Sequence, residues 1–119
     1  MTQAEELKQR TKRFALDVIE TLRSLPKSDE TRTLGNQLLR SATSVAANYR
    51  AVCRARSHRE FISKMGIVVE EADETVFWLE MLIELKLLSS LNAKQLLEEA
   101  HELLAIFAAS ELTAKNNRQ

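Results

Sequence analysis

The chain has 119 residues, with 17 basic and 17 acidic side chains and a formal net charge of zero. This length predicts one domain, covering residues 1–119. A single cysteine, Cys53, excludes an internal disulfide. The polar start and the lack of any run of 18 apolar residues predict neither a signal peptide nor a membrane span. We therefore expect a cytoplasmic protein.

Two glycines and one proline are few for this length, which favours a helical chain. Residues 4–25 form the first expected helix, because apolar side chains recur every three or four positions up to Pro26. Residues 31–56 form the second, with Thr31 or Thr33 as its cap. Its inward stripe is Leu34, Leu38, Ala42, Val45, Tyr49, Val52 and Arg56.

The third expected helix, residues 59–87, follows a capping box in which Ser57 and Glu60 satisfy each other's backbone amides. Its main stripe runs from Phe61 to Ile83. Asn92 and Gln95 suggest a second capping box before a fourth helix over residues 93–112. The inward face of that helix is Leu97, Ala100, Leu104, Phe107 and Ala108. Four amphipathic helices with short links predict an all-α, up-down-up-down antiparallel four-helix bundle.

The charge is divided along the chain. Residues 1–56 hold eleven basic and six acidic side chains, a net charge of +5, and the remainder carries −5. Either the halves neutralise each other within the bundle, or the basic half faces an anionic partner. Internal neutralisation is the commoner outcome, because facing helices often carry opposite charge.

Arg40, Arg50 and Arg54 fall on the outward face of the second helix among small residues. Such a face can attract a phosphate backbone without reading sequence, so these arginines are the candidate nucleic-acid contacts. The alternative is that they pair with the acidic half of another subunit. Arg56 is on the inward stripe and needs a carboxylate, for which Glu71 and Glu74 are the candidates.

The third helix carries a second apolar stripe, formed by Ile67, Trp78, Met81 and Leu85. An isolated bundle needs only one buried stripe on each helix. The second stripe therefore indicates contact with another subunit. The alternative is that Trp78 lies under a loop.

No constellation indicates catalysis, a cofactor or a metal. Glu98 and His101 supply one Glu-x-x-His spacing, whereas a di-iron bundle needs two, and Glu98 points outward. Cys53 reads as a small buried side chain rather than a catalytic thiol. Neither a nucleophile elbow nor a glycine-rich phosphate loop is present.

The run QLLRSATSVAANYRA-VCRARSHREF-ISKMGIVVEEADETVFWLEML, with Leu25-Pro26-Lys27 before it, resembles the four-helix bundle proteins encoded by intervening sequences in bacterial 23S rRNA genes. That family is similar to the accessory bundle protein of diversity-generating retroelements. The resemblance implies a left-handed bundle that assembles into a ring, usually a homopentamer. It implies no enzymatic activity. Asn48, Arg54, Ser57 and Glu60 are the motif positions that it carries over.

A nucleic-acid role is suggested for some relatives, which tend to be more basic than this chain. The first hypothesis is therefore a non-enzymatic, ring-forming bundle that contacts RNA or DNA through Arg40, Arg50 and Arg54. The alternative is a structural scaffold that binds a protein partner. An enzyme with a site between subunits is the third reading.

Overall fold

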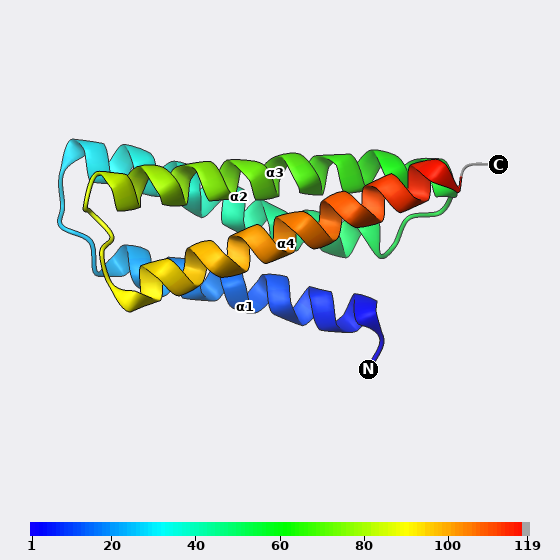
Figure 1. The fold of residues 1–119 in the computed structure, drawn as a ribbon, viewed down its shortest axis with the longest axis horizontal. Coiled ribbons are helices and arrows are strands. Elements are labelled where there is room, and N and C mark those ends of the chain that lie inside the picture. Colours follow the sequence, from blue (N-terminus) through cyan, green and yellow to red (C-terminus); the bar gives the residue numbers. More distant parts are fainter. Residues whose placement is uncertain (118–119) are drawn as a thin grey trace.

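The computed structural model describes residues 1–117, and within them the regular structure is four long helices. They are α1 (Gln3–Arg23), α2 (Asp29–Val52), α3 (His58–Glu84) and α4 (Leu91–Asn116). Figure 1 shows successive helices running back and forth along a long axis of 50 Å. α1 packs on α2, α2 on α3, α3 on α4, and α4 returns to α1. The predicted four-helix fold is confirmed, and its left-handedness stays a prediction.

A hydroxyl side chain begins every helix. Thr2, Ser28, Ser57 and Ser90 each accept a hydrogen bond from the backbone amide three residues on, at 3.0–3.3 Å. The Ser57 cap is therefore confirmed. The caps predicted at Thr31 or Thr33 and at Asn92 are wrong. The side chains of Ser28 and Ser90 accept the hydrogen bonds that cap α2 and α4.

The end of α2 differs most from the sequence prediction. We expected the helix to continue to Arg56, but it ends at Val52 and Cys53 is its C-cap. The amides of Arg54 and Ala55 donate to carbonyls only three residues back, which tightens the chain into a turn. The apolar period continues in the sequence for four residues past the end of the helix, and Arg56 does not belong to the inward stripe.

The core is continuous along the bundle and follows the predicted stripes of α1, α2 and α3 closely. In α4 the buried face matches the prediction at Ala100 and Phe107 and differs from it at the other positions. Leu96 and Leu103 are buried where Leu97 and Leu104 were expected, and Ala108 is exposed. Leu97 and Leu104 still pack on the core from its edge. The long apolar run of this helix leaves the phase of its stripe ambiguous.

None of the four helices has a long enough apolar stretch to cross a membrane within residues 1–117.

The C-terminus of α3 ends in a Schellman motif built on a lysine. Lys86 has a φ of 61°, in the left-handed region. The Leu87 amide donates to the Leu82 carbonyl at 2.9 Å, and the Lys86 amide donates to Ile83 at 2.9 Å. Glycine is the usual residue at this position, because its missing Cβ removes the steric cost.

We expect Lys86→Gly to raise the free energy of unfolding by about 1 kcal/mol, because it relieves the left-handed strain. Lys86→Ala is the matched control, since it removes the charge and keeps the Cβ. Urea unfolding followed by circular dichroism measures both. Equal stability of the two variants would contradict the prediction.

Tyr49 is the buried tyrosine of the core, and its ring centroid lies 5.1 Å from that of Phe107. Burial raises the pKa of Tyr49 above its ordinary value of 10.0, and the nearby Cys53 thiol adds to the shift. The folded state therefore holds the phenol proton at pH values where the unfolded chain has lost it.

Tyr49 should accordingly make the protein lose stability at alkaline pH. Its contribution is complete below about pH 10 and falls as pH rises further, by up to about 1.4 kcal/mol per pH unit. This part of the loss is absent in Tyr49→Phe. The free energy of unfolding of the variant should therefore fall less than that of the wild-type protein between about pH 9 and about pH 11.5. Denaturant unfolding across that range measures it, and parallel losses in both proteins would refute the assignment.

Candidate functional site

The three candidate nucleic-acid arginines are all exposed, but they are not equivalent. The Arg40 guanidinium donates to Glu74 at 3.0 Å and to Glu71 at 3.5 Å, both on α3. Its charge is therefore matched within the bundle. Arg50 lies in the last turn of α2 and Arg54 in the turn that follows, and no salt bridge within residues 1–117 involves either.

The predicted pairing of Arg56 with Glu71 or Glu74 is wrong. Arg56 is exposed in the connection between α2 and α3, and Arg40 occupies both carboxylates. The reason is the early end of α2, which carries Arg56 away from the face that meets α3. Sequence periodicity assigns Arg56 to the inward stripe because it treats α2 as continuing to Arg56, and it assigns Arg40 to the outward face.

A basic corner results where the chain turns from α2 into α3. We define it as Arg50, Arg54, Arg56 and Arg59, which are all exposed. Beside it lies a hollow of about 450 Å³ lined by Ala51, Arg54, Arg56, Glu60 and Lys64. Glu60 and Lys64 pair with each other at 3.6 Å, so they do not neutralise the corner. Arg56 and Arg59 were not predicted as surface cations, although their closeness to Arg54 in the sequence was the available signal.

Ser57 and Glu60 hold this corner in shape. The Glu60 amide donates to the Ser57 hydroxyl at 3.0 Å, which starts α3 directly after Arg56. The reverse half of the predicted capping box is not formed, since the Glu60 carboxylate faces Lys64. Asn48 is half-buried on α2, one helical turn before Val52.

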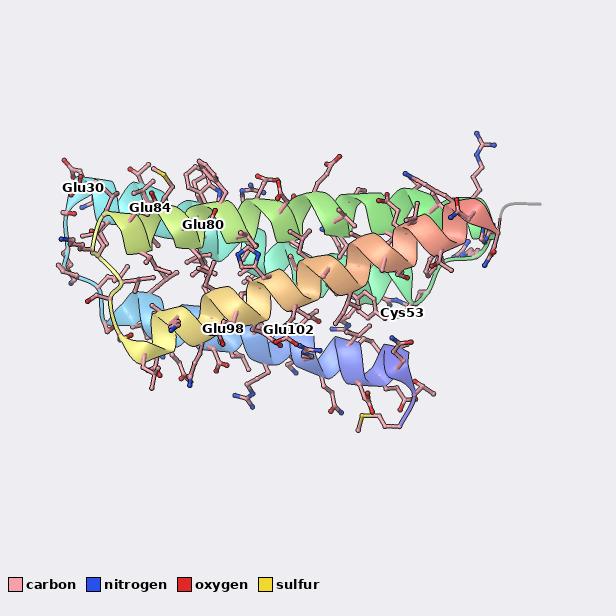
Figure 2. All side chains as sticks on the ribbon, viewed as in Figure 1. Glu30, Cys53, Glu80, Glu84, Glu98 and Glu102 are labelled. Atoms are coloured by element: carbon pink, nitrogen blue, oxygen red, sulfur yellow. The ribbon has the colours of Figure 1, made fainter. Side chains whose placement is uncertain are left out.

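Cys53 is exposed at the same end of the bundle (Figure 2), so its prediction as a buried side chain is wrong. As the C-cap of α2 it lies where the helix turns away from the core. His58 begins α3, and its ring is hydrogen-bonded to another part of the bundle. Its Nε2–H donates to the Ala114 carbonyl at 2.8 Å and ties α3 to the end of α4.

The second stripe of α3 is only partly covered. Ile67 and Leu85 have 46% and 49% of their surface exposed, whereas Trp78 and Met81 are half-buried. Phe77, which falls on neither predicted stripe, is 51% exposed, and its ring meets the Trp78 indole edge-on at 4.8 Å. The Trp78 indole N–H is buried without an acceptor in residues 1–117.

Two larger hollows lie between α1 and α4. One, of about 650 Å³, is lined by residues that include Arg13, Thr21 and Asn92, and the other, of about 590 Å³, by residues that include Leu7, Ile106 and Ser110. No group of three metal-ligating side chains occurs within residues 1–117. Glu98 and His101 are both exposed on α4.

A solved structure and a family model are similar to this chain. No curated protein matches the chain. A solved structure from Bacteroides thetaiotaomicron VPI-5482, described as a protein with unknown function from the S23 ribosomal protein family, is similar with a TM-score of 0.81 and 27% sequence identity. The match covers 92% of this chain and 98% of that one.

A family model, the 23S rRNA-intervening sequence protein, matches residues 4–109. This range takes in α1, α2, α3, the basic corner and most of α4. The chain belongs to the 23S rRNA-intervening sequence protein family.

Proposed function

We propose that this protein is a non-enzymatic bundle that self-associates and binds nucleic acid through the basic corner. The observation that supports the binding is the charge imbalance there. Four exposed arginines lie in or beside one turn, and the carboxylate of Glu60, which lines the hollow beside them, pairs with Lys64. Guanidinium groups bind phosphate oxygens well, because their planar donors match the phosphate geometry.

The proposed contacts differ from those expected from sequence. Arg50 and Arg54 remain, and Arg56 and Arg59 join them. Arg40 leaves the set, because binding a phosphate would require breaking its contacts with Glu71 and Glu74. No aromatic side chain belongs to the corner, so base stacking is not part of the proposal. Binding through the backbone alone would be insensitive to sequence and strongly weakened by salt.

Self-association is the second part of the proposal. Ile67, Phe77 and Leu85 expose about half of their surface on one helix, and exposed apolar surface of this kind favours a subunit contact. The family resemblance suggests a homopentameric ring. A cytoplasmic location suits the exposed thiol of Cys53, which a reducing compartment would keep free.

Nucleic-acid titration at about 50 mM and about 200 mM salt tests the binding, with a short duplex DNA and a single-stranded RNA as probes. Four phosphate contacts predict a log–log salt slope of about −3.6 for the duplex, which corresponds to an affinity loss of roughly a hundredfold. Arg50→Glu with Arg54→Glu should abolish most of this dependence.

The matched control is Arg32→Glu, which makes the same change on the same helix, about 27 Å from Arg50. Arg32 is exposed and pairs only with Asp29, so its replacement should leave binding nearly unchanged. Binding that ignores salt, or that the double variant retains, would exclude the corner as the interface. A protein partner would then be the better reading.

Replacing Ile67 and Leu85 with lysine should reduce the assembly to monomers, because each new charge would be buried in the subunit contact. Sedimentation at micromolar concentration reports the mass. Leu112→Lys is the control, since Leu112 is 60% exposed on α4 and outside the proposed contact. A monomeric wild-type protein would refute the self-association, whatever the variants do.

A further inference from the structure

Among the residues that the structure describes, a single one makes the side-chain hydrogen bonds that tie the first helix to the rest of the bundle. Within residues 1–117, every hydrogen bond between an α1 side chain and another helix comes from Arg10. Its Nε and Nη2 donate to the two carboxylate oxygens of Glu99 at 2.7 Å each. Nη2 also donates to Glu102 at 3.0 Å. We call this set of contacts the Arg10 clamp.

The remaining polar groups of α1 are satisfied inside α1. The buried Thr11 hydroxyl donates to the Leu7 carbonyl at 2.8 Å, and the Thr21 hydroxyl donates to the Asp17 carbonyl at 2.8 Å. The helix would therefore keep these hydrogen bonds if it moved away from the bundle. Leaving would expose apolar side chains and break the Arg10 clamp, but it would leave no helix amide unpaired.

The seam where α1 meets α4 contains two hollows. Its two hollows, of about 650 Å³ and about 590 Å³, lie toward opposite ends of α1. Arg10 lies between them along α1 and belongs to the lining of the larger one. Figure 1 shows α1 and α4 diverging toward the N-terminus of α1. In Figure 2, Glu102 lies on α4 beside α1, at the middle of this seam.

The connection between α1 and α2 can act as the hinge. Residues 24–28 contain Pro26, which cannot extend the helix, and Ser28 caps α2 independently of α1. α2, α3 and α4 are tied to one another by other contacts, namely those of Arg40 with α3 and of His58 with Ala114. They would remain a packed body while α1 moves.

We infer that α1 is a releasable helix, which opens from the body formed by α2, α3 and α4 as a unit and is held closed by the Arg10 clamp. Because part of the clamp is exposed to solvent, salt weakens it and favours the open form. Opening uncovers apolar side chains that line the two hollows, among them Leu7, Phe14 and Phe107. This inference does not depend on nucleic-acid binding.

Amide hydrogen exchange on the full-length protein tests the opening. Under native conditions, amides around Phe14 and Val18 should exchange at least about tenfold faster than those around Val76 and Leu79, because subglobal opening needs less free energy than global unfolding. Raising the salt concentration should accelerate exchange in α1 selectively. Equal exchange in α1 and α3, or exchange in α1 that salt does not change, would overturn the inference.

Arg10→Met keeps the apolar stem of the side chain and removes the clamp. It should speed exchange in α1 by roughly five- to thirtyfold, with a smaller change in α3, and remove the salt effect. Arg40→Met breaks the corresponding contacts between α2 and α3 and is the matched control, which should leave exchange in α1 unchanged. If Arg10→Met accelerated α1 and α3 equally, the clamp would serve global stability and the inference would be wrong.

Discussion

The turn from Cys53 to Ser57 determines where the charge and the reactive groups of this protein lie. Had α2 continued to Arg56, that arginine would have needed a buried carboxylate, and Cys53 would have belonged to the core edge. Instead the chain tightens after Val52, and the Ser57 hydroxyl restarts it as α3. The residues of the turn are thereby turned outward, and arginines from two helices meet at one corner.

Two arginine clamps join the basic half of the chain to its acidic half. Arg10 pairs with Glu99 and Glu102, and Arg40 pairs with Glu71 and Glu74. In both cases one guanidinium bridges two carboxylates spaced three residues apart, which lie on one face of a helix. Internal neutralisation therefore accounts for these two arginines, whereas the basic corner keeps its charge. Neutralisation within the bundle and an unmatched basic surface therefore both occur, in different parts of the protein.

The helix contacts that surround the two arginine clamps differ. Around Arg40, α2 and α3 are held together by a continuous apolar seam that includes Leu38, Val45 and Val68. Around Arg10, two hollows lie along the seam between α1 and α4. The apolar surface that α3 leaves exposed lies elsewhere, at Ile67, Phe77 and Leu85. Release of α1 and self-association would thus use separate surfaces of the same bundle.

The sequence by itself determined the helical class, the number of helices, the inward faces of α1, α2 and α3, and the Ser57 cap. It did so because the 3.6-residue period and a serine before a glutamate are local signals. Its family motifs indicated the membership that the match over residues 4–109 established.

Only the tertiary structure decided which charges are matched. The helical projection puts Arg40 on the outward face and Arg56 on the inward stripe, yet the position of α3 and the end of α2 together make Arg40 the partner of Glu71 and Glu74. The Arg10 clamp joins residues 89 and 92 positions apart, a contact that no local pattern encodes. Ion pairs of this kind depend on how whole helices pack, and packing is a property of the assembled bundle rather than of any one segment.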